Sequence, residues 1–184
     1  MLNLKTNRAR IIMVISYVVL IYLTLPVMRP VLNYLKAHLG IRFGLYTDVV
    51  LIAMMFGLAV TFIRSKLTWK QWLVVSAVFF LYGYGLKVLK IPEERIHLLE
   101  YGFLSFLVYQ IYSSARPVLT GYWQTFLTVC FIGTLDEIIQ YCLPNRVGDI
   151  RDIILNIVSG LLGLILTVVC YQKTAKILPK SPHL

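Results

Sequence analysis

The chain alternates between long apolar runs and short polar connections along its 184 residues. A helix rises about 1.5 Å per residue, so crossing a hydrocarbon core of roughly 30 Å takes about 20 mostly apolar residues. Six windows meet this requirement: Ile11–Met28, Leu45–Ile63, Gln71–Leu89, Ile96–Tyr112, Tyr122–Leu143 and Ile153–Tyr171. Because the runs are continuous rather than alternating with a period of two, they predict transmembrane helices and not the strands of a barrel.

Composition indicates that lipid is the solvent of these helices. Hydrophobic residues make up 59% of the chain and charged residues 14%, which is too little polar surface for a soluble globule. The predicted fold class is therefore all-α, a polytopic transmembrane bundle of about six spans joined by short loops. We expect residues 1–184 to form a single integral membrane domain, with the lipid bilayer as its main partner.

The basic residues flank the apolar runs in twos and threes. This distribution of a net charge of +10 indicates anchoring at the membrane surface and argues against nucleic-acid binding. With six spans, the side that holds both termini contains Lys5, Arg8, Arg10, Arg64, Lys66, Lys70, Arg116, Lys173, Lys176 and Lys180. The opposite side contains Arg29, Lys36, Arg42, Lys87, Lys90, Arg95, Arg146 and Arg151. This bias predicts that both termini are cytoplasmic.

Acidic residues are concentrated in one part of the chain. Seven of the eight Asp and Glu residues lie between positions 93 and 152. In a six-span topology, the connections 87–95 and 144–152 open to the same, non-cytoplasmic side. We therefore expect two stretches that are remote in sequence to bring ionisable side chains together at the outward end of the bundle.

The first of these stretches is the start of the fourth predicted helix. Pro92 suits a helix start, and His97 and Glu100 are three residues apart, so they share one helix face. Glu100 is expected roughly one turn inside the hydrocarbon, where a carboxylate is costly unless it is protonated, paired or next to water. Two interpretations stay open: a functional group, or a structural ion pair with His97 or Arg151.

The second stretch covers two predicted helices joined by a turn. Asp136 and Glu137 precede Gln140 by four and three residues, and the first helix is expected to end near Pro144. Because Asp136 and Glu137 are adjacent, only one of them is expected to face the bundle centre. The candidate ligand-binding residues of this stretch are Gln140, Arg146, Asp149, Arg151, Asp152 and Asn156.

Small residues and cysteines within the predicted spans are interpreted as packing positions. Ser159 and Gly163 are four residues apart with Gly160 between them, a pattern that permits close approach of another helix. No Cys-x-x-Cys pair occurs, so neither a zinc cluster nor a disulfide framework is predicted. The cysteines, interpreted as small buried hydrophobic residues, are Cys130, Cys142 and Cys170.

The polar residues together offer acids, a general base and guanidinium donors for an anion. The candidate catalytic residues are His97, Glu100, Asp136 and Glu137. No Gly-x-Ser-x-Gly, Gly-x-x-x-x-Gly-Lys or His-Glu-x-x-His motif accompanies them. One His with several carboxylates can hold a divalent cation, although a single His gives little support for zinc. The residues leave the cofactor and the metal undefined.

The two stretches resemble the VanZ-like family, small bacterial membrane proteins named for a member associated with resistance to the glycopeptide teicoplanin. The resemblance covers about residues 92–171. It rests on His97, Glu100, Tyr101, Gly102, Asp136, Glu137, Gln140, Pro144, Arg146, Asp149, Asp152, Asn156, Gly160 and Gly163. Glu94 departs from the Lys that family members often carry, and Asn145 departs from their Gly. Anion binding would therefore depend on Arg95, Arg146 and Arg151.

The resemblance implies a cell-envelope role in the bacterial cytoplasmic membrane. In this role the outward polar cluster engages a cell-wall precursor, a lipid head group or the drug, and contributes to reduced teicoplanin susceptibility. Other functions stay open: an intramembrane enzyme acting on a lipid-linked phosphate or ester, a transporter that uses the acids as a proton or ion relay, and a purely structural ion-pair network. The sequence indicates neither an oligomeric state nor a choice among these functions.

Overall fold

The computed structural model describes residues 6–40, 42–63, 67–89, 91–113, 117–144 and 149–177, and within them it contains helices and no strand. The helices are α1 (Asn7–Leu39), α2 (Arg42–Ile63), α3 (Trp69–Val88), α4 (Pro92–Tyr112), α5 (Val118–Cys142) and α6 (Ile150–Ile177). Each apolar window of the sequence corresponds to one of these helices. The prediction of an all-α transmembrane bundle is therefore confirmed.

Four helices of the described chain are long and apolar enough to cross a membrane: α1, α3, α5, and α6 over Ile150–Cys170. Their outward side chains include large exposed apolar groups, such as Phe80 at 72% and Phe131 at 65% exposure. Apolar side chains exposed in this number are typical of a surface that lipid covers. The bundle is therefore a multi-pass membrane protein.

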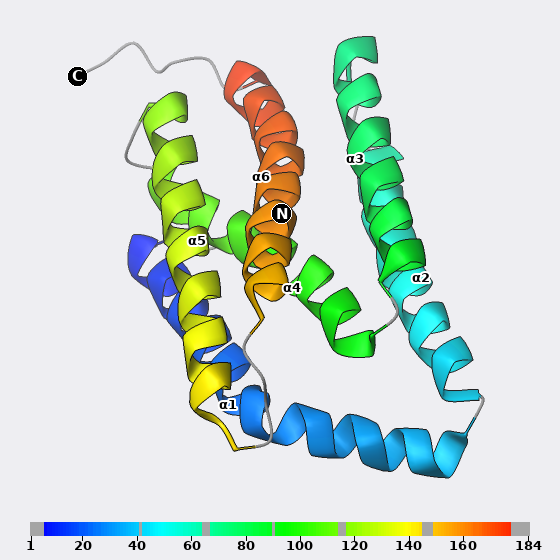
Figure 1. Cartoon of the computed structure of the whole chain (residues 1–184). Coiled ribbons are helices and arrows are strands. Elements are labelled where there is room, and N and C mark those ends of the chain that lie inside the picture. The colour runs from blue at the N-terminus through cyan, green and yellow to red at the C-terminus, as the bar shows by residue number, and fades with distance from the viewer. Residues whose placement is uncertain are drawn as a thin grey trace.

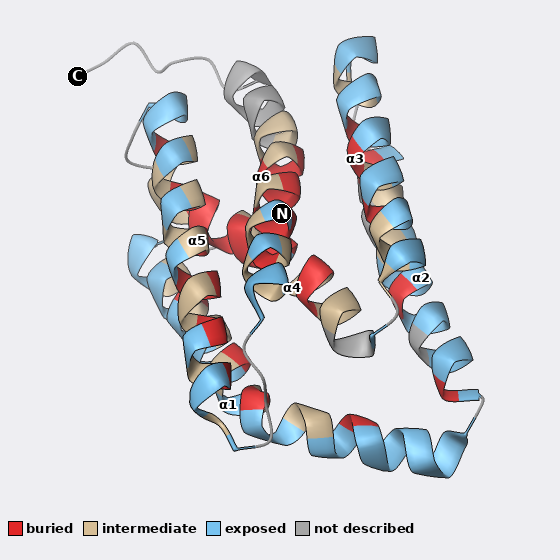
Figure 2. Ribbon diagram, viewed as in Figure 1, coloured by how far each residue is buried: buried red, intermediate tan, exposed pale blue. Residues whose placement is uncertain are grey.

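Helix α4 differs from its neighbours because it lies inside the bundle. It packs against α6, α5 and α1, and Figure 2 shows buried residues concentrated along it. Two apolar clusters meet on it, one with α1 and α5 around Leu104, and one with α2, α3 and α6 around Leu98. Since protein rather than lipid surrounds α4, this helix can carry polar side chains that would be costly on an outer helix.

Helix α1 extends further than the sequence analysis expected. The predicted span ended at Met28 and was followed by a connection, but the helix continues to Leu39, with Pro26 and Pro30 inside it. A proline removes one backbone hydrogen bond and bends a helix without having to end it. In Figure 1 the first half of α1 packs beside α5, and the second half lies across one end of the bundle towards α2. The helix stops at Gly40, whose positive φ of 54° suits a glycine.

The backbones of α4 and α6 approach each other closely where they cross. A β-carbon on Gly163 would overlap the backbone carbonyl of Gly102, and the Ser105 hydroxyl donates a hydrogen bond of 2.7 Å to the carbonyl oxygen of Gly160. The predicted packing role of the small residues of α6 is confirmed. Cys130 and Cys170 are half-buried and Cys142 is exposed, so the interpretation of the cysteines as buried residues holds in part for the first two and was wrong for Cys142.

Candidate functional site

The polar cluster forms where the first half of α4 packs against the second half of α5. The Nδ1 atom of His97 lies 3.4 Å from Oε2 of Glu100 and 3.8 Å from Oδ2 of Asp136. His97 and Asp136 are 6% and 0% exposed. Gly133 of α5 permits this packing, because a β-carbon there would lie 2.9 Å from the β-carbon of Asn156 on α6 and 3.2 Å from the ring of Tyr101 on α4. The structure thus brings together ionisable residues from both stretches.

The side chain of Gln140 connects the two adjacent acids of α5. Its Nε2 donates to Oδ2 of Asp136 at 3.3 Å and to Oε1 of Glu137 at 3.1 Å. Both acids are buried, so the expectation that only one would face the bundle centre was wrong. Adjacent helical residues point about 100° apart. His97 of α4 flanks Asp136, while the backbone N–H of Asp149, just before α6, donates to Oε2 of Glu137 at 3.4 Å.

The cluster carries more negative than positive groups. Glu100, Asp136 and Glu137 face a single imidazole, and among the described residues no Lys or Arg lies within ion-pair distance of them. A buried charge is stable only when it is paired, hydrogen-bonded or bound to a metal ion. Within the described chain, the positive groups of the cluster are thus fewer than its acids, and a proton or a cation can balance the difference.

Several polar atoms in and beside the cluster are not satisfied by the protein. Buried atoms that have no hydrogen-bond partner within the described chain include Nδ1 of His97 and Oδ1 of Asn156, while the hydroxyl of Tyr101 lies close to the carboxylate of Asp136 without a well-formed hydrogen bond. Such groups are rare in native structures, because leaving one unsatisfied costs about 1–3 kcal/mol. Unsatisfied atoms from α4 and α6 at one place are typical of a binding site.

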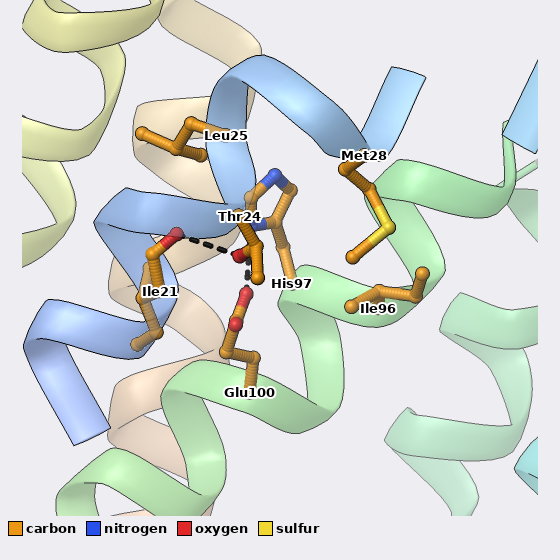
Figure 3. A pocket seen from close by; sticks show the side chains of 7 residues that line it. All are labelled: Ile21, Thr24, Leu25, Met28, Ile96, His97 and Glu100. Atoms are coloured by element: carbon orange, nitrogen blue, oxygen red, sulfur yellow. Dashed lines mark hydrogen bonds and ion pairs between the residues drawn. The ribbon is translucent and has the colours of Figure 1, made fainter. Parts of the chain in front are cut away.

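A small cavity adjoins the cluster between α1 and α4. Figure 3 shows Thr24, His97 and Glu100 pointing into it, with Ile21, Leu25, Met28 and Ile96 as its apolar wall. Its free volume of about 20 Å³ has room for a single water-sized species. Glu100 and His97 of α4 therefore border a small space whose remaining lining is apolar apart from Thr24 of α1.

The remaining candidate binding residues take different positions. Asn156 is buried in α6, and its Nδ2 donates to the carbonyl oxygen of Gly133 at 3.3 Å. Asp152 is half-buried in the first turn of α6. The side chains of Asp149 and Arg151 are exposed, and Asp149 accepts a hydrogen bond from the backbone N–H of Arg151. Arg146 and Asn145 lie outside the described residues.

The guanidinium groups do not gather at the cluster in the described part of the chain. Arg95 donates through Nε to the carbonyl oxygen of Leu89 at 2.7 Å and forms an ion pair with Asp48 of α2. The structural partner that the sequence analysis considered for Glu100 is therefore His97 and not Arg151. An anion site built on Arg95 and Arg151 is not supported.

Sequence reasoning missed the contribution of α1. Thr24 lines the cavity, the hydroxyl of Tyr17 donates to the carbonyl oxygen of Glu100 at 3.3 Å, and that of Tyr22 donates to the carbonyl oxygen of Ile132 at 2.9 Å. The sequence contained a signal for this contribution, because these hydroxyl-bearing residues interrupt the otherwise apolar first window. Tyr101, which also belongs to the site, directly follows Glu100 in the sequence.

The chain matches the family model described as VanZ/LLP1 over residues 10–171. The match extends the resemblance from the motif region at residues 92–171 to the helices before it. Comparison with curated proteins and with solved structures found no match. Since the family model covers most of the chain, including all four residues of the cluster, this protein belongs to the VanZ/LLP1 family.

Proposed function

We propose that this protein acts in the cell envelope by engaging an amphiphilic ligand at the cluster of His97, Glu100, Asp136 and Glu137, and that it thereby reduces teicoplanin susceptibility. The ligand is a lipid-linked cell-wall precursor, a lipid head group or the glycopeptide itself. Family membership supports a membrane protein of this kind, and the position of the cluster supports the choice of site.

The observation that carries the proposal is the cavity between α1 and α4. Its polar lining consists of His97 and Glu100 of α4 and Thr24 of α1, and its apolar lining includes Leu25 and Met28 of α1. Ligand sites are commonly apolar with a few polar groups that fix orientation. The cavity has room for one polar head-group atom beside His97 and Glu100, and the alkyl chain of such a ligand would lie outside it, along the apolar residues of α1.

The proposed orientation agrees with this role. The cluster lies at the end of the bundle where α5 leads into α6 (Figure 1). Cytoplasmic termini, as expected from the charge bias, would put this end outside the cytoplasm, where glycopeptides act on cell-wall precursors. A carboxyl-terminal reporter that is active only outside the cell would contradict this orientation.

Expression of the protein in a glycopeptide-sensitive host is expected to raise the teicoplanin concentration that inhibits growth, and Glu100→Gln is expected to abolish the increase. The substitution keeps the shape of the side chain and removes the charge beside His97. The inhibitory concentration is measured together with the amount of protein in the membrane.

The matched control is Asp48→Asn, the same acid-to-amide change at a half-exposed residue of α2. An exposed ion pair contributes little to stability, so this variant is expected to behave as the wild type. Unchanged susceptibility in cells that contain correctly inserted wild-type protein would contradict the proposal.

A second candidate function is hydrolysis of a lipid-linked phosphate or ester. It is favoured by the Nδ1 atom of His97, which lies between the carboxylates of Glu100 and Asp136 and has no hydrogen-bond partner in the described chain. An imidazole held in this way can take a proton from an attacking water, while a carboxylic acid returns one to the leaving group.

The enzyme hypothesis predicts that purified protein converts a lipid-linked cell-wall precursor into a new species. Glu100→Gln is expected to lower the rate of this conversion by roughly 10²–10⁴-fold. Chromatography of the extracted lipids measures the conversion. If the wild-type protein turns over no member of a broad panel of phospholipids and precursors, this second function is excluded.

A further inference from the structure

We propose that His97, Asp136 and Glu137 bind one divalent transition-metal cation. The inference concerns the same site as the proposed function, and it rests on the proposed function for the choice of that site. It does not require that the ligand be a drug or a precursor. It begins from the positions of three buried side chains that belong to α4 and α5.

The three side chains have the spacing that a metal ion needs. Each offers one ligand atom, and these atoms all lie within 4.8 Å of one another. In the tetrahedral arrangement usual for Zn²⁺, ligand atoms on bonds of about 2.0–2.2 Å lie roughly 3.4 Å apart. Closing the site on an ion therefore takes a movement of at most roughly 1.4 Å between the widest pair, which small side-chain rotations can supply.

The unsatisfied atoms of the cluster point to the same ligand. Nδ1 of His97 is buried and has no hydrogen-bond partner among the described residues, and Oδ1 of Asp136 has at most the hydroxyl of Tyr101 nearby, without a well-formed hydrogen bond. His97, at 6% exposure, and Asp136, at 0%, are more than nine-tenths buried. A cation would use the free electron pairs of the imidazole and the carboxylate, and would balance the surplus negative charge of the acids.

Surrounding groups resemble the outer shell of a metal site. Gln140 holds one oxygen of Asp136 and one of Glu137 through its amide, as hydrogen-bonded neighbours of metal ligands commonly do. The cavity beside His97 and Glu100 has room for one water. Of the three proposed ligands, His97 borders this cavity, so a water or a head-group oxygen in it would lie next to the imidazole that holds the cation.

The ligand types favour a transition metal over Mg²⁺ or Ca²⁺, which prefer oxygen ligands only. Carboxylates suit Mn²⁺, and imidazole suits Zn²⁺. At a site of given ligands Zn²⁺ binds more tightly than Mn²⁺. Mn²⁺ is therefore a useful probe. We expect Zn²⁺ to displace bound Mn²⁺, and we expect Mg²⁺ at the same concentration to leave it bound.

The test titrates Mn²⁺ into the full-length protein, purified in detergent and freed of metals by a chelator, and measures free Mn²⁺ by electron paramagnetic resonance. The wild type is expected to bind one Mn²⁺ per chain. Asp136→Asn is expected to weaken binding at least 10-fold, and Gln140→Leu about 10–100-fold. Asp48→Asn, the acid-to-amide control on α2, is expected to leave the affinity unchanged.

Two results would overturn the inference: a folded wild-type protein that binds neither Mn²⁺ nor Zn²⁺, or a site of equal affinity in folded Asp136→Asn. If Asp136→Asn does not fold, Glu137→Gln decides in the same way. Metal bound at the cluster without any change in teicoplanin susceptibility contradicts only the proposed function. A change in susceptibility that depends on Glu100, without metal binding, contradicts only the metal site.

Discussion

Gly163→Ala is expected to destabilise the protein by about 3 kcal/mol or more, the upper end of what overpacking costs. The added β-carbon would overlap the backbone carbonyl of Gly102, and a backbone atom cannot move aside as the end of a flexible side chain can. Helices α4 and α6 must then separate, which moves His97 and Glu100 relative to α5. Unfolding of the purified protein by titration with a denaturing detergent measures the loss.

The matched control is Gly83→Ala on α3. A β-carbon at Gly83 meets no atom within 4 Å, and alanine favours the helix by about 1 kcal/mol over glycine. This variant is expected to be as stable as the wild type or slightly more so. Equal stability of the Gly163 and Gly83 variants would show that the α4–α6 crossing tolerates separation, against the packing described above.

His97→Gln is expected to destabilise the metal-free protein by about 3–5 kcal/mol, the cost of removing one partner from a buried ion pair. The imidazole is the only basic group of the described chain within ion-pair distance of Glu100 and Asp136. Without it, buried Asp136 and half-buried Glu100 have no positive partner among the described residues. The free energy of unfolding in the presence of a chelator measures the effect.

A second substitution tests the reason for this loss. Asp136→Asn removes one of the surplus charges at nearly constant shape, so alone it is expected to be neutral or stabilising. In the double variant it is expected to recover most of the stability that His97→Gln loses, because it relieves the repulsion. Additive effects of the two changes would mean that His97 and Asp136 do not interact.

Membrane embedding and the number of helices followed from the sequence alone. Continuous apolar runs of about 20 residues, without the alternation of barrel strands, form helices in lipid whatever they pack against. The length and the bend of α1 could not be predicted from the sequence in the same way. Whether Pro26 and Pro30 end a helix or bend it depends on what the residues after them contact, so the helical segment up to Leu39 emerged only from the structure.

Most of the cluster residues could also be predicted from the sequence. An ionisable group inside an apolar segment is energetically unfavourable in lipid and therefore indicates a site. The arrangement of the cluster residues could not be predicted. The burial of both Asp136 and Glu137 depends on two different neighbours, His97 of α4 and the backbone of Asp149, which local spacing cannot reveal. The exposed positions of Asp149 and Arg151, and the cavity formed with Thr24 of α1, likewise depend on packing.

The sequence by itself determined which segments enter the membrane and which side chains are costly there, because both follow from the transfer of single groups between water and lipid. Only the tertiary structure decided which of those side chains meet. That outcome is set by the close crossing of α4 and α6 at Gly102 and Gly163, and by the packing of Gly133 of α5 against Tyr101. These are contacts between residues far apart in the chain, and their geometry depends on all the helices at once.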